Sequence, residues 1–323
     1  MRISDILADP AVAQELDRKF REVDTPRPPA DAGELAPAAR AGFLPGAGFR
    51  STLPFEASST QQALFSIILE VGRPVVLIQN NTFQVPPDSD LWQAPLEAAR
   101  SRIETAALSV GRINLGNHPD VEWAGTGWLI ADNLLVTNRH VAVVFAQRSG
   151  NDIVFQPGAD GGPVRAWVDF RQEHGVAAQE PVQITRVHYM ADGPDVAFLE
   201  LAPAPAGSPR RAPLPLAASV PPPSTALAVI GYPTWDERRN DPAVMQRIFQ
   251  GIYSVKRLSP GRSTASDIVG EIGHDCTTLG GNSGSPVLSL DTGEVIGLHY
   301  SGKVREVNHA VPAPVVASLL GRL

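Results

Sequence analysis

The sequence contains a single cysteine, Cys276, so the chain cannot form an internal disulfide. Because structural disulfides are common in oxidising compartments and rare in the cytosol, this favours a reducing environment. Residues 1–5 lack the basic and then apolar pattern that begins a secretory signal. No apolar run approaches the length of a membrane span. We therefore expect a cytoplasmic protein without a membrane partner.

Basic residues are outnumbered by acidic residues. The chain has 27 Lys and Arg residues against 34 Asp and Glu, and its net charge is −7. This balance argues against nucleic acid as the main partner. Aromatic residues make up only 6%, but hydrophobic residues reach 43%, which is enough for a sizeable core. His118, His174, His188, His274 and His309 are scattered along the chain and form no metal-binding spacing with Cys276. We therefore expect neither a metal nor another cofactor.

A loop rich in glycine and serine, residues 277–287, is the most informative stretch. Glycine permits backbone conformations that a Cβ would block. If Ser283 is a nucleophile, the N–H groups of Ser283 and Gly281 can face the oxygen that becomes negative during acyl transfer. Taken alone, the loop is equally compatible with a Gly/Ser-rich hairpin turn.

Two further motifs supply the groups that a nucleophilic serine needs. His140 stands just past an apolar strand, and Asp195 opens an alternating apolar strand. A neutral histidine accepts the serine proton near pH 7. A buried aspartate fixes the tautomer of that histidine and stabilises its cationic form. Asp192 and Asp169 are alternatives, but Asp195 is favoured because it alone opens such a strand.

Together the motifs resemble those of chymotrypsin-like serine peptidases of the bacterial, trypsin-like type, including glutamyl endopeptidases. Gly-Asn-Ser-Gly-Ser-Pro (281–286) is similar to their nucleophile motif. Thr-Asn-Arg-His-Val-Ala (137–142) resembles their histidine motif, and Asp-Val-Ala-Phe-Leu-Glu-Leu (195–201) resembles their aspartate strand. The resemblance extends from about residue 107 to the C-terminus. It implies an all-β fold of two six-stranded antiparallel barrels, with the site in the cleft between them.

The resemblance also implies a role for each site residue. His140 would be the general base, Asp195 would orient it, and Ser283 would be the nucleophile. Gly281 and Ser283 would donate the oxyanion-hole N–H groups. Ser285 is the rival nucleophile, but it stands where relatives more often carry glycine.

Asn282 departs from the pattern of many animal relatives. Those relatives carry an aspartate at this place, which pairs with the ammonium of a newly cleaved N-terminus and so forms the oxyanion hole. Asn282 is neutral and cannot make that ion pair. We therefore expect that such a cleavage does not switch on this protein, and that any control comes through the N-terminal part of the chain.

The residues before the nucleophile loop and the strand after it would line the S1 pocket. His299 and Thr278 fall where glutamyl endopeptidases read an acidic P1 side chain, which is the first alternative. A cationic or donating imidazole could bind such a carboxylate. If His299 is only a hydrogen-bonded strand residue, a small or apolar P1 is expected instead. Asp275 would favour a basic P1 if it projected into the pocket.

The N-terminal part of the sequence is expected to be a small, mainly helical module, residues 1–105. Apolar spacing predicts helices over 3–23, 62–70 and 92–105, a short strand over 75–78, and a linker near 24–57. No catalytic pattern is visible there. We favour an adaptor or regulatory module that binds an activating protein partner over a structural extension of the first barrel.

The rest of the chain, residues 106–323, is expected to form the peptidase domain. Its predicted parts are a first barrel (106–202), a proline-rich linker (203–223), a second barrel (224–312) and a C-terminal helix (313–323). The predicted strands include 153–156 in the first barrel and 251–258 in the second. We expect a serine endopeptidase that acts on protein or peptide substrates. The alternative is a catalytically idle protease fold that serves as a scaffold or binding module.

Overall fold

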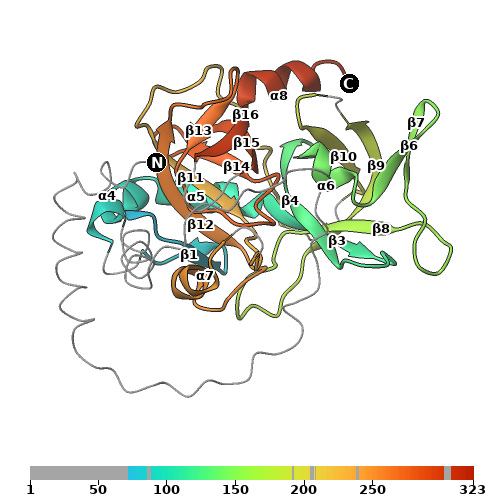
Figure 1. The fold of residues 1–323 in the computed structure, drawn as a ribbon, viewed down its shortest axis with the longest axis horizontal. Coiled ribbons are helices and arrows are strands. Elements are labelled where there is room, and N and C mark those ends of the chain that lie inside the picture. Colours follow the sequence, from blue (N-terminus) through green and yellow to red (C-terminus); the bar gives the residue numbers. More distant parts are fainter. Residues whose placement is uncertain are drawn as a thin grey trace.

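The structure is a computed structural model that describes residues 72–85, 89–190, 193–203, 207, 209–237, 240–301 and 307–323 (Figure 1). The helices expected over 3–23 and 62–70 and the linker near 24–57 lie outside these residues. Among the described helices, none has both the length and the apolar character needed to cross a membrane.

Six antiparallel strands close the first barrel in the order β10-β5-β4-β3-β8-β9. Its core is a cluster of buried aliphatic and aromatic side chains that includes Ile113, Leu135 and Leu199. The strands are β3 (Val110–Gly116), β4 (Trp123–Ala131), β5 (Leu134–Thr137), β8 (Arg165–Asp169), β9 (Pro181–Met190) and β10 (Ala197–Leu201).

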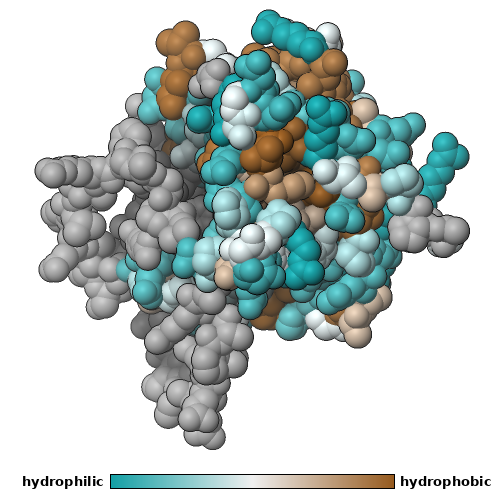
Figure 2. All heavy atoms as spheres, turned by 90° about the vertical axis from the view of Figure 1, so that its right-hand side faces the viewer, coloured by the Kyte–Doolittle hydropathy of each residue, from teal (hydrophilic) through white to brown (hydrophobic). Residues whose placement is uncertain are grey.

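The strand expected at 153–156 does not belong to this barrel. It forms β7 (Asp152–Phe155), which pairs only with β6 (Ala146–Ser149) in a separate two-stranded sheet. This hairpin projects from the first barrel (Figure 1). No residue of β7 is fully buried, and Ile153 and Phe155 pack only partly against the first-barrel core. Figure 2 views the molecule from this side, where hydrophilic residues cover most of the described surface.

The second barrel also closes with six antiparallel strands. Its order is β11-β14-β15-β16-β13-β12, and pairing of β11 with β12 completes the ring. The two six-stranded barrels that the motifs implied are therefore confirmed. The strands are β11 (Ala226–Gly231), β12 (Arg257–Thr264), β13 (Ile272–His274), β14 (Pro286–Ser289), β15 (Val295–Ser301) and β16 (Asn308–Pro312), and the helix α8 (Ala313–Leu320) follows them.

The strand expected at 251–258 is largely wrong, because β12 begins only at Arg257. Gly251 and Ser254 both have positive φ values, +71° and +60°, which end regular structure. They follow helix α7 (Pro242–Phe249), whose first turn is capped by the Asp241 carboxylate through the N–H groups of Ala243 and Val244.

The described part of the N-terminal region packs directly on the second barrel. It contains β1 (Val76–Gln79), β2 (Thr82–Phe83), α4 (Asp90–Ala98) and α5 (Arg100–Leu108). Strand β1 pairs antiparallel with β12, so it extends the sheet of that barrel. The helix expected at 92–105 is present as α4 and α5, which meet at Ala99. Trp92 and Leu96 are completely buried in the same core cluster as second-barrel residues.

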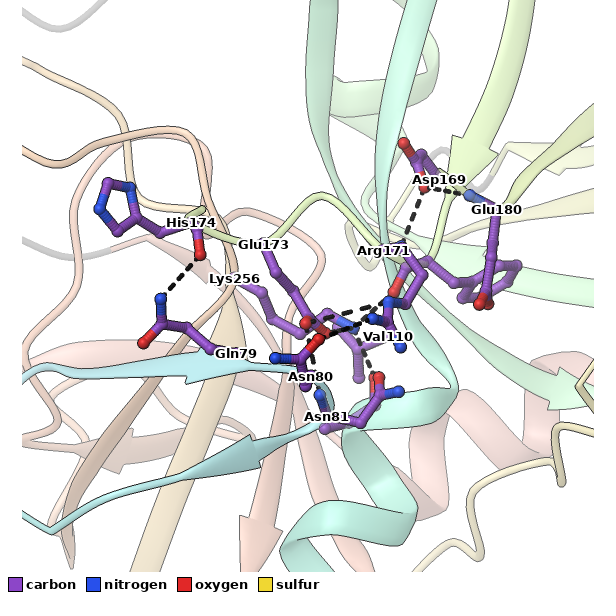
Figure 3. A network of polar contacts seen from close by, with 12 residues as sticks. Gln79, Asn80, Asn81, Val110, Asp169, Arg171, Glu173, His174, Glu180 and Lys256 are labelled. Atoms are coloured by element: carbon purple, nitrogen blue, oxygen red, sulfur yellow. Dashed lines mark hydrogen bonds and ion pairs between the residues drawn. The ribbon is translucent and has the colours of Figure 1, made fainter. Parts of the chain in front are cut away.

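A polar network joins this region to both barrels (Figure 3). The buried Lys256 donates to the carbonyls of Ala107 at 2.8 Å and Phe170 at 2.7 Å. Its ammonium lies 3.7 Å from the Glu173 carboxylate, which also accepts from the backbone N–H of Asn81. Burial lowers the pKa of Lys256 to about 8, although Glu173 opposes that shift. The network therefore fixes the β1–β2 hairpin, α5 and the two barrels to one another.

Candidate active site

Pairing of β5 with β10 brings His140 and Asp195 together. Ala197 is in register with Thr137, so the residue that follows β5 and the residue that precedes β10 lie at the same end of the sheet. His140 belongs to the short helix α6 (Arg139–Ala142). Its Nδ1 lies 2.6 Å from Asp195 Oδ2, and its backbone N–H donates to Asp195 Oδ1 at 3.0 Å. These two contacts fix both the ring and the backbone of His140 against one carboxylate.

The environment keeps Asp195 ionised. Burial alone raises the pKa of this carboxyl, but hydrogen bonds from the ring and backbone of His140, its charge, and the Arg139 backbone N–H lower the pKa by more. The His140 and Asp195 side chains are 36% and 27% exposed, so the free side of the imidazole can reach solvent or a bound substrate.

The serine loop is a tight turn that requires glycine at two places. Asn282 N donates to Leu279 O at 3.2 Å, and Gly281 between them has φ +84°. A Cβ on Gly281 would lie 2.4 Å from the Trp123 ring. Gly284 has φ +88°, and a Cβ there would lie 2.0 Å from a backbone carbonyl of β4. The positive φ values and the lack of space both exclude larger residues.

Two threonines set the orientation of the turn. The Thr234 N–H donates to Gly280 O at 2.7 Å, and Thr126 Oγ1 donates to Gly281 O at 2.8 Å. Since the C=O and N–H of a trans peptide point in opposite directions, the first bond turns the Gly281 N–H away from Thr234. Within the described ranges, neither the Gly281 N–H nor the Ser283 N–H donates to a protein acceptor.

Ser283 lies at the junction between the two barrels. Its carbonyl accepts from the Thr126 N–H at 2.9 Å. A Cβ on Gly125 would lie 3.1 Å from that carbonyl and 2.8 Å from Val141, the neighbour of His140, so glycine lets the two loops approach. The Ser283 hydroxyl donates to Tyr300 O at 3.4 Å. The described residues show no hydrogen bond between Ser283 and His140. Such bonds are often long without substrate and tighten when it binds.

The geometry separates Ser283 from the rival serine. Ser285 is completely buried, and its Oγ lies 2.0 Å from the position that a Cβ on Gly231 of β11 would take. Its hydroxyl therefore faces the second barrel, whereas Ser283 is 8% exposed. Among the alternative aspartates, Asp169 accepts from the N–H groups of Arg171 and of Glu180 and does not contact His140. Asp192 lies outside the described residues.

His299 and Thr278, the residues expected to read an acidic P1 side chain, are both buried and hydrogen-bonded. His299 Nδ1 lies 3.1 Å from His274 Nε2. Thr278 Oγ1 donates to Asn308 Oδ1 at 2.9 Å. Burial lowers the pKa of His274 to about 3. Burial, then the neighbouring charges of His274 and His140, lower the pKa of His299 well below its usual value. Both imidazoles are therefore neutral at pH 7.

Asp275, the residue expected to favour a basic P1, is bound by Arg73. The guanidinium forms a fork on the carboxylate, with Nε at 2.7 Å from Oδ1 and Nη2 at 2.5 Å from Oδ2. Both side chains are 6% exposed. The charge of Asp275 is thus neutralised inside the protein.

Sequence reasoning did not find Arg73, His274, Thr126 or Thr234, because each acts through a partner that is distant in the chain.

Among the described residues, no group of three or more His, Cys, Asp or Glu side chains could hold a metal ion. Cys276 is buried, and burial raises the pKa of its thiol.

Two antiparallel six-stranded barrels, with a His–Asp pair on one and a serine loop on the other, define the class of trypsin-like serine peptidases. The sequence matches the family described as "Trypsin-like peptidase domain" over residues 125–298, which is more than half of the chain. The chain belongs to that family.

Individual relatives were also found. A protein of Lysobacter enzymogenes named as a probable serine protease is 29% identical over 275 residues, which cover 76% of this chain and 70% of that protein. The crystal structure of the active form of the Rv3671c protease from M. tuberculosis is 20% identical, with a TM-score of 0.44, over 70% of this chain and 86% of that one. A serine endoprotease from Yersinia pestis is 15% identical, with a TM-score of 0.46, over 74% of this chain and 67% of that one.

Proposed function

We propose that this protein is a serine endopeptidase in which Ser283 forms an acyl-enzyme and His140 and Asp195 act as the general-base pair. The observation that carries the proposal is the His140–Asp195 contact at 2.6 Å, on a loop whose Val141 lies close to the Ser283 loop across Gly125. A partly exposed histidine that one carboxylate orients is suited to act as a general base.

The chemistry follows from these positions. His140 Nε2 takes the hydroxyl proton as Ser283 Oγ bonds to the peptide carbonyl carbon, and Asp195 stabilises the imidazolium that forms. The carbonyl oxygen becomes negative and accepts from the N–H groups of Gly281 and Ser283. His140 then gives its proton to the leaving amine as the C–N bond breaks. Water, activated by the same histidine, attacks the ester and releases Ser283 and the acid product.

An acidic P1 side chain is the preference that the pocket supports best. His274 Nδ1 is buried without a partner in the described structure, and an orphaned buried N–H is rarer than an orphaned acceptor. His274 therefore carries its proton on Nε2 and donates it to His299 Nδ1. That leaves the His299 proton on Nε2, where it can donate to a substrate carboxylate. A basic P1 loses its support, because Arg73 already binds Asp275.

The uncut chain is expected to be active. Thr234 holds the Gly280–Gly281 peptide and Thr126 holds the Gly281–Asn282 peptide, so the turn does not depend on a new N-terminus that pairs with residue 282. We further propose that an activating protein partner binds within residues 1–105. We also propose that the protein is cytoplasmic.

A fluorophosphonate probe and a peptide library test the proposal. The uncut wild-type chain should be labelled on Ser283 and should cleave library peptides, most rapidly after Glu or Asp, whereas Ser283→Ala should do neither. Ser285→Ala is the matched control and should keep its label. Absence of labelling and cleavage in a folded wild-type chain would instead favour the scaffold alternative.

A further inference from the structure

Arg73 reaches the site from outside the segment that matches the peptidase family, residues 125–298. It is 5% exposed and precedes β1. Its partner Asp275 directly follows β13, 202 residues away in the chain. The forked contact uses both carboxylate oxygens, which is the most specific geometry available to this pair of side chains.

Arg73 also binds the same loop through its backbone. Its carbonyl accepts from Thr277 Oγ1 at 2.9 Å. Asp275 Oδ1 accepts in addition from the Arg262 N–H at 2.7 Å, which ties the loop to β12. On the other side, Asn308 Nδ2 donates to Cys276 O at 2.6 Å. The loop 275–279, which leads into the serine turn, is thus held between Arg73 and Asn308.

The position of Arg73 is itself fixed by the N-terminal region. Trp92 of α4 donates through Nε1 to Gly72 O at 2.9 Å, and the Arg73 guanidinium lies 5.6 Å from the centre of the Trp92 ring. A few residues later, β1 pairs with β12. The guanidinium therefore cannot swing away without disturbing a buried aromatic side chain and a strand.

We propose that Arg73 is a positioning residue for peptide hydrolysis. It holds the loop 275–279 so that the S1 wall and the oxyanion-hole turn that follows keep their working geometry. The inference rests on the proposed peptidase function and assigns part of the active centre to the N-terminal region. Losing Arg73 leaves the buried Asp275 carboxylate unpaired, and that carboxylate must then move toward water. The loop would move with it.

The test uses full-length Arg73→Ala and Arg73→Lys variants. The matched control is Arg102→Ala, because Arg102 is also an arginine of the N-terminal region but donates to Leu290 O, after the end of β14. With a cleaved peptide, Arg73→Ala should lower kcat/KM by about 10- to 100-fold, since small misplacements cost that much. Arg73→Lys should restore part of the loss, and Arg102→Ala should stay near wild type.

Two probes separate the parts of the effect. A small fluorophosphonate without a peptide reports the nucleophile and the oxyanion hole, whereas the peptide KM also reports the S1 wall. Both should deteriorate in Arg73→Ala, while circular dichroism shows a folded chain. If Arg73→Ala does not fold, Arg73→Leu/Asp275→Leu removes both charges together and takes its place. A folded variant with wild-type kcat, KM and labelling rate overturns the inference. An inactive, unlabelled wild type would instead refute the peptidase proposal.

Discussion

Two histidines, His140 and His299, lie on either side of the barrel junction, and each is paired with a different kind of partner. His140 is half-exposed and bound to a carboxylate at 2.6 Å. His299 is buried and bound to a second imidazole, His274, at 3.1 Å. The first environment places a carboxylate, that of Asp195, directly against the imidazole. The second disfavours a cation, because burial removes water and the imidazole that His299 contacts is neutral.

In the mechanism proposed above, this difference lets one residue type serve two tasks. A general base must gain and lose a proton in each turnover, so it needs a partner that favours its charged form. A specificity residue that donates a hydrogen bond must keep one tautomer, so it benefits from a partner that fixes the proton. The carboxylate pairing and the imidazole pairing supply these two conditions.

The largest expected effect concerns the carboxylate of the first pair. Asp195→Asn keeps the size of the side chain but removes the charge that stabilises the imidazolium, and it favours the wrong His140 tautomer. We expect kcat to fall by about 10⁴-fold at pH 7. The measurement is single-turnover cleavage of the best library peptide. His274→Gln, which alters the partner in the second pair, should lower kcat far less. Equal losses in the two variants would contradict the division of roles.

A smaller effect is expected for substrate choice. His299→Gln keeps a donor but loses the fixed imidazole geometry, and His299→Val removes the donor. A hydrogen bond to a charged group contributes about 1.5–3 kcal/mol. His299→Val should therefore lower kcat/KM by about 10- to 150-fold for a peptide with Glu at P1. It should change kcat/KM little for the same peptide with Ala at P1. An equal loss for both peptides would mean that His299 supports the fold or the base and does not read P1.

The contrast between the pairs also explains what could be predicted from the sequence. His140 and Asp195 stand in local motifs at strand ends, so short stretches of sequence are sufficient to predict them as site residues. Both barrels were expected for the same reason. Nothing near His274 indicates that it meets His299, because the contact arises from how β13, β16 and β15 pair in the second barrel.

Other misses have the same physical origin. Arg73 and Asp275 meet only after β1 joins β12, and no local pattern reports such a contact. The late start of β12 follows from Ser254, a residue other than glycine with positive φ, which the sequence does not indicate. Strand β7 has the alternation of a barrel strand, but Ile153 and Phe155 are only partly buried against the first-barrel core, and β7 pairs with β6 alone.

The smallest expected effect is on acid stability, and it tests the neutral state of the second pair. The pKa of His274 is about 3 in the folded protein, against 6.5 as its ordinary value. Between these values the unfolded chain binds a proton that the folded chain does not, so stability is lost as pH falls below 6.5. The loss is about 1.4 kcal/mol per pH unit for a fully coupled group. His299 acts in the same direction.

His274→Gln removes one such group, so the free energy of unfolding, measured by urea denaturation from pH 7 to pH 4, should fall less steeply than in wild type. Above pH 7.5, where both imidazoles are neutral in either state, the difference between the two proteins should be constant. Parallel curves across the acid range would show that His274 takes up its proton while still folded, and the assignment of a fixed neutral donor at His299 would then have to be withdrawn.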